Sequence, residues 1–383
     1  MVASSGVLTC ALGLRGMLAF RDLPVLPQAS EAPSGRRVSV RAVLPSRDSD
    51  EALTATIRRL LEQNLRPEIR LEVVVVDDRS QRPVSESVPQ DLLGDPRLRT
   101  MRIDQLPGGW LGKPHACTVG ARDFEGDFLL FIDDDTWTEP DFLQRLVEEA
   151  ICSDADHLCL LPRLRDTTPS GRALVAAMAF GMLQRIRGLE SDRPGPGFGV
   201  GACTLVRRTA YEAVGGHADR RMDVLEDIEL ANAIRSKKLR SRIRVGTDVV
   251  SVRWIQNWSS AFGLTEKNWF AAFDYRTTFA ILGVAVGLVV GSSNLFGPFV
   301  AERPVARTLA GLGLLTSASL AAAHARRVGW SWWTGILAPI AQVLIPVTIA
   351  WSALRITRDG GVRWRSAFHP LAELRAARRA PRA

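Results

Sequence analysis

"DFLLFIDDDTWTEPDFL", residues 127–143, places three consecutive aspartates directly after an apolar run that is typical of a buried β-strand. Carboxylates this close repel one another, and the repulsion is relieved when a cation, most economically a divalent metal, joins them. A solvated acidic turn is the alternative that the triplet alone leaves open. The rest of the chain has to decide between these two interpretations.

The segments around the triplet alternate between strand-like and helix-like patterns. "LEVVVVDDRS" (71–80) is so rich in valine that a strand buried on both faces is expected, as in parallel sheets. Because strands that alternate with helices form βαβ crossovers, the chain predicts an α/β fold with a mostly parallel, Rossmann-like sheet. The other expected strands are residues 38–44, which Pro45 ends, 98–104 and 128–135, and the expected helices are residues 50–64, 116–124 and one that starts at Glu226.

Acidic residues end two of these strands. Ligands of such sheets collect at the carboxyl ends of the strands, and both Asp77-Asp78 and Asp133–Asp135 lie there. One cluster fits a solvated turn, but two clusters at the same edge of one sheet indicate a binding site.

Charge is distributed unevenly along the 383 residues. The net charge is +8, but residues 276–383 hold thirteen arginines and three acidic residues, which leaves −2 for residues 1–275. The basic excess therefore belongs to an apolar, arginine-rich portion, and no nucleic-acid partner is expected. The five cysteines form no C-x-x-C pair and are typical of reduced thiols in a cytosol-facing domain.

Three apolar blocks occupy the C-terminal part of the chain. Residues 277–300, 305–323 and 330–354 are long enough to span a membrane, and the third opens with an aromatic cluster and contains two prolines. Three full crossings would put the arginine-rich tail opposite the globular part, against the positive-inside tendency. Either the proline-bearing segment is re-entrant or the tendency fails here.

The N-terminal part is less regular. The apolar run of residues 1–20 is short for a span and interrupted by Arg15, so a weak anchor or an interfacial segment is expected. Residues 171–188, with apolar runs and basic ends, are expected either to lie on the membrane or to form a core helix. The predicted organisation is an apolar segment and Pro/Ser/Gly-rich linker (1–37), a catalytic domain (38–275), a membrane domain (276–354) and an arginine-rich tail (355–383).

The polar residues near the sheet edge suit transfer from an activated donor. Mg²⁺ or Mn²⁺ on a few carboxylates holds the oxygens of a diphosphate, and Lys113, in a glycine-flanked turn, adds a positive charge. Glu226-Asp227, at a helix start, offer a rigidly held general base. Because the chain has no P-loop or kinase motif set, a sugar nucleotide fits these residues better than ATP.

From about residue 38 to residue 274 the chain resembles a family 2 glycosyltransferase with a GT-A fold. "VLPSRDSDEAL" is similar to that family's opening strand and its P-A-R-N-E-type turn. The resemblance implies that Pro45 and Arg47 contact the nucleotide sugar, with Asp48 in place of the family's Asn.

Two further motifs carry the same resemblance. "VVVVDDRS" is similar to the nucleotide-binding strand end, which implies that Asp77 and Asp78 contact the base and ribose. "FIDDDT" is similar to the D-x-D-T metal motif, which implies that Asp133 and Asp135 flank a Mg²⁺ or Mn²⁺ ion, with Asp134 in the variable middle place beside the donor.

The last motif supplies the base. "VLEDIELANAIRSKKLR" resembles the family's E-D motif, whose aspartate is the base of inverting members. This assigns Asp227, with Glu226 as its neighbour, and Lys113 is expected to contact the donor phosphates. The motifs are individually weak, but they occur in the family's order.

A narrower likeness concerns the acceptor. "GGWLGKPHACTVGA", "GACTLVRRTAYEAVGGH" and "EKNWF" resemble the subgroup that acts on membrane lipids, such as carotenoid- and hopanoid-associated glycosyltransferases. Processive polysaccharide synthases carry a Q-x-x-R-W motif, and "VRWIQNW" lacks the Gln at that spacing. Transfer of a single sugar is therefore favoured over synthesis of a polysaccharide or cell-envelope glycan.

Two other classes of protein fit the sequence less well than a glycosyltransferase. Haloacid-dehalogenase-like phosphohydrolases carry D-x-D-x-T/V, but Trp137 stands two residues after Asp135 here. A catalytically inactive, membrane-anchored binding protein is disfavoured because every aspartate of the motifs is present. His115 and His217 are expected to be structural, and Arg207-Arg208 either reach a diphosphate or face an interface.

The resemblance therefore implies an inverting, metal-dependent glycosyltransferase with two expected substrates. One is a nucleoside-diphosphate sugar and the other is a lipid acceptor in the membrane. The protein is expected to be a multi-pass protein of the cell membrane with its catalytic domain in the cytoplasm.

Overall fold

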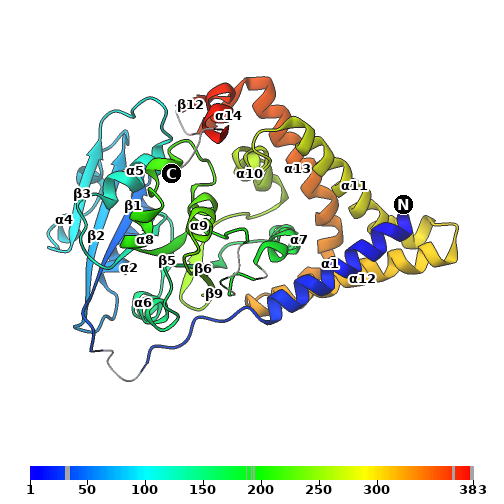
Figure 1. Cartoon of the computed structure of the whole chain (residues 1–383), viewed down its shortest axis with the longest axis horizontal. Helices are drawn as coiled ribbons and strands as arrows, with labels where there is room; N and C mark the ends of the chain where they lie inside the picture. The colour runs from blue at the N-terminus through cyan, green and yellow to red at the C-terminus, as the bar shows by residue number, and fades with distance from the viewer. Residues whose placement is uncertain (31–34, 187, 191, 193–194, 365–366, 380–383) are drawn as a thin grey trace. The chain divides into compact units, whose positions relative to one another are not determined.

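The computed structural model describes residues 1–30, 35–186, 188–190, 192, 195–364 and 367–379, and its chain divides into two compact units (Figure 1). The first, the α/β unit, is built from residues 24–164 and 188–252. The second, the helical unit, is built from residues 1–23 and from two later parts of the chain that begin at Arg165 and Arg253.

A seven-stranded, mostly parallel sheet forms the centre of the α/β unit, as the sequence predicts. Within this sheet β8 runs antiparallel to both of its neighbours, β4 and β6. The strand order is β3 (Leu98–Ile103), β2 (Ile69–Asp78), β1 (Val38–Ser46), β4 (Phe128–Ile132), β8 (Cys203–Arg207), β6 (His157–Leu161) and β9 (Ser241–Val245).

β1 continues past the proline that was expected to end it. Pro45 pairs with Val76, and the next residue of β1 still pairs with β2. On its other side β1 pairs with β4 only over residues 40–43. Pro45 therefore lies where one side of β1 has no partner strand, and its missing N–H breaks no ladder hydrogen bond there.

Both faces of the sheet are covered by helices, as the valine-rich strands predict. Successive side chains of a strand point to opposite faces, so Val73 and Val75 join one buried cluster, whereas Val74 and Val76 join another. The first cluster includes α2 (Asp50–Leu61) and α6 (Phe142–Cys152), and the second includes α5 (Gly112–Ala121), α8 (Arg208–Ala213) and α9 (Glu226–Ser236).

Smaller elements complete the α/β unit. The predicted linker packs on it, since Val25 forms a bridge with Val245 of β9 and Leu26 is buried; residues 31–34 of that linker lie outside the described chain. The remaining elements are the sheet β5 (Trp137–Thr138), β10 (Val250–Val252) and β7 (Arg163–Leu164), the helices α3 (Val84–Ser87) and α4 (Gln90–Leu93), and the 3₁₀ turn η1 (Ala218–Arg220).

The helical unit contains four segments long and apolar enough to cross a membrane. One of them is α1, which runs unbroken through Arg15 for 20 residues, whereas a weak anchor or an interfacial segment was expected there. These segments are α1 (Val2–Arg21), α11 (Thr277–Val300), α12 (Pro304–Arg327) and Trp332–Asp359, the last formed by η2 (Trp332–Leu337) and α13 (Ala338–Asp359).

The rest of the helical unit packs around these segments (Figure 1). The helix expected over residues 171–188 is α7. The elements are α7 (Pro169–Ile186), α10 (Trp258–Ala272), the hairpin β11 (Gly361–Trp364) and β12 (Ala367–Pro370), and α14 (Leu371–Arg379).

Candidate active site

The two acidic clusters lie at the same edge of the sheet, as predicted. β2 lies on one side of β1 and β4 on the other, so the chain changes direction across the sheet at β1. Crevices at such switch points, at the carboxyl ends of the strands, are where α/β sheets bind ligands. Asp77 pairs with Ser46 at the end of β1, and Asp133–Asp135 follow the end of β4.

Lys113 joins the aspartate triplet to the Glu226-Asp227 pair. Its Nζ lies 2.7 Å from Asp133 Oδ1 and 2.8 Å from Glu226 Oε1. Burial alone would lower the pKa of Lys113, but the charges of Asp133 and Glu226 outweigh it and hold the pKa well above its usual value. The lysine is therefore a fixed positive charge, and it lies in the first turn of α5, where the helix dipole adds to it.

Asp227 is the carboxylate of this pair that is left to react. Burial and the charge of Glu226 raise the pKa of Asp227 to about 6, while Lys113 opposes the shift. One oxygen, Oδ1, accepts the N–H of Ile228 at 2.8 Å. Glu226 is buried and bound to Lys113, so the geometry separates a structural carboxylate from an available one.

Gly201 keeps open the space between these charges. A Cβ atom on Gly201 would lie 3.0 Å from Lys113 Nζ and 3.5 Å from an Oδ2 atom of both Asp133 and Asp227. The sequence contains this glycine in "GACTLV", just before β8, but its role depends on three distant segments and was not recognised. Its lack of a side chain leaves a small cradle lined by one ammonium and two carboxylates.

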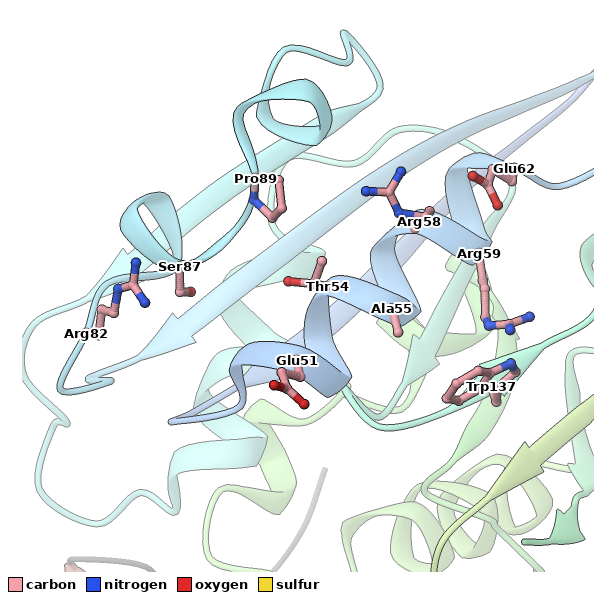
Figure 2. Close-up of a pocket in the computed structure, with 10 residues that line it drawn as sticks. All are labelled: Glu51, Thr54, Ala55, Arg58, Arg59, Glu62, Arg82, Ser87, Pro89 and Trp137. Atoms are coloured by element: carbon pink, nitrogen blue, oxygen red, sulfur yellow. The ribbon is translucent and has the colours of Figure 1, made fainter.

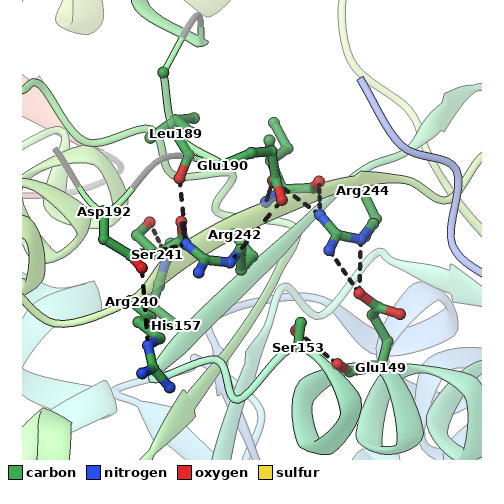
Figure 3. A network of polar contacts seen from close by, with 12 residues as sticks. Glu149, Ser153, His157, Leu189, Glu190, Asp192, Arg240, Ser241, Arg242 and Arg244 are labelled. Carbon is green, nitrogen blue, oxygen red and sulfur yellow. Dashed lines mark hydrogen bonds and ion pairs between the residues drawn. The ribbon is translucent and has the colours of Figure 1, made fainter. Parts of the chain in front are cut away.

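Arginines of β9 bind acidic residues of the segment that precedes Gly201 (Figure 3). Arg244 lies 2.8 Å from Glu190 and 2.6 Å from Glu149 of α6, and Arg242 lies 2.9 Å from Asp192. Further along the loop, a Cβ on Gly199 would lie 2.2 Å from the carbonyl oxygen of Asp227. The loop backbone therefore rests on the first turn of α9.

The other two aspartates of the triplet have different surroundings. Asp135 is exposed to the cleft, and loss of solvation together with the charges of Asp133 and Asp134 raises its pKa to about 6. Asp134 is buried, and its Oδ2 accepts the hydroxyl of Ser46 at 2.8 Å. Thr56 donates to the backbone carbonyl of Asp134 at 3.0 Å. Asp134 thus ties the turn to β1 and α2.

The two aspartates that end β2 also differ. Asp77 accepts the N–H groups of Ser80 and Val84 and lies 2.6 Å from Arg102. Burial would raise the pKa of Asp77, but these hydrogen bonds outweigh it and lower the pKa. Asp77 therefore holds the turn after β2.

Asp78 is buried beside the start of α5. It binds Arg79 at 2.8 Å and lies 3.9 Å from Arg47. Its Oδ2 comes so near Gly112 that a Cβ there would lie 2.1 Å away. The predicted donor residues Arg47, Asp78 and Lys113 therefore follow one another along the cleft edge.

The conformation of the turn after β1 explains why Asp48 can take the place of the family's Asn. Asp48 has a φ of 51°, a left-handed conformation that Asn and Asp adopt more readily than most residues. Its N–H donates to Ser80 Oγ at 3.0 Å, and its Oδ1 accepts the N–H of Gln81 at 2.7 Å. The substitution preserves a turn that links the ends of β1 and β2.

Both histidines are structural, as expected. His217 is buried against Phe131, its Nδ1 lies 2.9 Å from the Tyr211 hydroxyl, and burial lowers its pKa to about 3. His115 is buried beside Trp110, and burial also lowers its pKa. Both rings stay neutral near pH 7.

Arg207, the last residue of β8, and Arg208, the first of α8, lie away from the aspartate triplet. Arg207 pairs with Phe128, at the opposite end of β4 from the triplet, and binds Asp156 at 3.3 Å. Arg208 binds Glu212 at 2.7 Å. The alternative that this basic pair contacts a diphosphate is therefore wrong.

A separate hollow of about 650 Å³ lies between α2 and the segment around α3 (Figure 2). It is lined by residues of both charges, and Arg59 stacks on Trp137 with its Cζ 4.1 Å from the ring centre. The hollow contains none of the residues around Gly201, so it is distinct from the candidate active site.

The donor set fits a magnesium or manganese ion. Among the described residues, no three His, Cys, Asp or Glu side chains form a complete metal cage. Mg²⁺ and Mn²⁺ sites at phosphates need fewer, because one or two carboxylates are completed by phosphate oxygens and water. Asp133, whose Oδ2 lines the Gly201 cradle, and Asp135, two residues later, would supply hard oxygen ligands of this kind.

Comparison with known proteins adds to this geometry. Residues 42–215 match the Glycosyl transferase family 2 model. An N-acetylglucosaminyltransferase of Sinorhizobium fredii is 32% identical over 38% of this chain and 35% of its own length. A 4,4'-diaponeurosporenoate glycosyltransferase of Staphylococcus haemolyticus is 22% identical over 56% of each chain. The chain thus spans about a third to a half of these relatives.

A solved structure supports the fold. The mannosyltransferase PcManGT from Pyrobaculum calidifontis, in complex with GDP-Man and Mn²⁺, superposes with a TM-score of 0.52 over 94% of this chain and 99% of its own. The two sequences are 16% identical. The likeness confirms a GT-A-type fold.

Removal of Lys113 tests its role as the central charge. Lys113→Met leaves the buried Glu226 carboxylate without its cation, so we expect the variant to lose about 1–3 kcal/mol of unfolding free energy. Lys113→Met/Glu226→Gln should recover most of this loss because it removes both charges. Denaturant unfolding of the purified variants in detergent measures both. Equal losses in the single and double variants would contradict the pairing.

Proposed function

Since residues 42–215 match the Glycosyl transferase family 2 model, we propose that the protein is an inverting, metal-dependent glycosyltransferase that transfers a single sugar from a nucleoside-diphosphate sugar to a membrane lipid. The observation that carries the proposal is the convergence of Asp133, Lys113 and Asp227 on the cradle at Gly201. The proposed acceptor group is a hydroxyl or a carboxyl.

Asp133 and Asp135 would hold Mg²⁺ or Mn²⁺. When bound, the ion would neutralise charge on the leaving diphosphate. Lys113 and the amino end of α5 stabilise the same negative charge from the protein side. Arg47 and Asp78 line the route toward the nucleoside, whereas Asp77 and Asp134 act through the turns that they hold.

Asp227 is the proposed base. It takes the proton of the acceptor hydroxyl while the acceptor oxygen forms its bond to the anomeric carbon. The bond from that carbon to the diphosphate oxygen breaks at the same time, and its electron pair leaves with the diphosphate. Attack opposite the leaving group inverts the anomeric centre. Glu226 is unsuited to this role because Lys113 binds it.

The proposed lipid acceptor rests on the helical unit. The unit has four segments apolar enough to enter a membrane, and a relative is named for a diaponeurosporenoate substrate. The five free cysteines agree with a catalytic unit on the cytoplasmic face of the cell membrane.

Nucleotide binding tests the donor site directly. UDP, GDP and dTDP are titrated into the purified protein with and without Mn²⁺ by calorimetry. We expect one nucleotide to bind preferentially and only with the metal. If none of the three nucleotides bound with either Mg²⁺ or Mn²⁺, the result would contradict the proposal.

Two conservative substitutions separate the metal from the base. Asp135→Asn should abolish the metal-dependent part of nucleotide binding, because it removes a charged ligand. Asp227→Asn should keep that binding and lower turnover by about 10²–10⁴-fold, the usual contribution of a general base. Turnover is followed as release of nucleoside diphosphate. A near-normal rate for Asp227→Asn would show that the base is another residue.

The pH dependence of turnover follows from the raised pKa of Asp227. A carboxyl with a pKa of about 6 is protonated below that pH and cannot accept a proton. Turnover at saturating donor should therefore fall about tenfold per pH unit below 6. Nucleotide binding is measured over the same range, since the pKa of Asp135 is also about 6. A decline that begins only near pH 4 would contradict the assignment.

Gly201 offers a steric test of the cradle. Gly201→Ala places a methyl group 3.0 Å from Lys113 Nζ, and we expect at least a tenfold loss of nucleotide affinity in Mn²⁺, about 1.4 kcal/mol. Gly108→Ala is the matched control, since its Cβ meets nothing within 4 Å. Unchanged affinity in Gly201→Ala, with a normal melting temperature in both variants, would show that the ligand lies elsewhere.

A further inference from the structure

The helical unit fixes the directions of α1, α11 and α12 relative to one another. Gly6 of α1 packs on Leu309 of α12, and Phe20 packs on His324, so residue numbers rise together and the two helices are parallel. Arg327, at the end of α12, donates to the carbonyl of Phe20 at 2.6 Å and also binds that of Leu23. The end of α12 therefore lies beside the end of α1.

α11 and α12 run in opposite directions. Gly297 packs on Ala310, whereas Asn294 packs on Gly313, which lies further along α12. A turn of a few residues around Glu302 joins the two helices. Thr277, Leu23 and Val328 thus lie at one end of the bundle, here called the near end. Glu302 lies at the other end, with the start of α1.

The near end is the end joined to the α/β unit. α1 leads into that unit at residue 24, and Val25 is already paired with β9. Because the α/β unit is a folded domain with a polar surface, the near end marks the side of the membrane on which that unit lies.

The last candidate span starts and finishes at the near end. It starts at Trp332, a few residues after α12 ends, and Gly335 packs on Ala322 in the last turns of α12. After it finishes, Arg375 of α14 donates to the carbonyl of Tyr275 at 3.0 Å, and Arg378 binds Asp274 at 3.1 Å. These partners directly precede α11.

The middle of this segment packs on α7, on α10 and on the middle of α11, where a Cβ on Gly287 would lie 2.6 Å from Pro346. Ala341 belongs to a buried cluster with Ala173 and Leu174 of α7 and with Ile255, and Ser352 accepts the N–H of Phe270 in α10 at 3.0 Å. Both ends of α7 continue into the α/β unit, so α7 cannot leave that side of the membrane.

We propose that residues 332–359 do not cross the membrane but lie in the leaflet next to the α/β unit, so that α1, α11 and α12 make three crossings. Length and apolar composition alone make this segment a candidate span, but an odd number of crossings from α11 to α13 would separate Arg375 from Tyr275. The proposal does not depend on the substrate or the chemistry of the site.

The exposed face of residues 332–359 binds the boundary region of a phospholipid leaflet. Trp332, Trp333 and Trp351 are exposed, as is Leu354, and tryptophan prefers the level of the lipid head groups. Arg355, half of whose side chain is accessible, follows at the end that approaches the tail and suits anionic head groups. The arrangement also places the arginine-rich tail on the side of the α/β unit and resolves the conflict with the positive-inside tendency.

Sidedness of labelling tests the proposal. Single cysteines are introduced in a Cys152→Ser background at exposed positions: Ser331→Cys, Ala376→Cys and Glu302→Cys. Membrane vesicles of known orientation are treated with a membrane-impermeant maleimide. The unmodified protein, whose exposed Cys152 lies in the α/β unit, marks that unit's side.

We expect Ser331→Cys and Ala376→Cys to label from the same side as Cys152, and Glu302→Cys from the opposite side. Labelling of Ser331→Cys and Ala376→Cys from opposite sides would overturn the proposal, because residues 332–359 would then cross. Labelling of Glu302→Cys from the side of Cys152 would overturn the assignment of α11 and α12 as crossings. Melting temperatures in detergent identify variants that fail to fold, and Ser4→Cys, which should label with Glu302→Cys, gives an independent reading of α1.

Discussion

The ammonium of Lys113 bridges carboxylates that would otherwise repel one another across the end of the sheet. Asp133 arrives from β4 and Glu226 from α9, and each lies within 2.8 Å of the same nitrogen. One cation cannot neutralise every carboxylate near it, so burial first, and the remaining negative charge second, raise the pKa of Asp227 and of Asp135. The same imbalance that favours a divalent cation also makes Asp227 basic enough to accept a proton near neutral pH.

This arrangement of charges requires close approach of three backbone segments. Gly201 must lack a side chain because a Cβ would meet Lys113, and Gly199 must lack one because its backbone rests on that of Asp227. A glycine-rich loop is entropically costly to order. Arg242 and Arg244 of the edge strand β9 offset that cost through ion pairs with Asp192 and Glu190. The outer edge of the sheet thus stabilises the centre of the site.

Much of this could be predicted from the sequence, because strand periodicity and chain order are local properties. The valine run of β2 predicted a sheet covered on both faces, and the position of Asp133 after an apolar strand predicted the cleft edge. Functions that depend on partners distant in sequence were not visible. Asp77 and Asp134 look like ligands in the sequence, but Arg102 and Ser46 bind them. Nothing local indicates that β8 reverses direction.

Hydropathy alone leaves the position of residues 332–359 open for a related reason. An apolar composition indicates that a segment avoids water. Both a position at the leaflet boundary and a full span of the membrane meet this requirement. Only contacts at both ends, such as that of Arg375 with Tyr275, distinguish them. Chain connectivity also joins the helical unit to the candidate active site. α7 leaves the α/β unit after Leu164 and returns at Gly188, and the next stretch of chain is the loop that ends at Gly201. α7 of the helical unit and the glycine of the cradle therefore belong to one continuous stretch of chain.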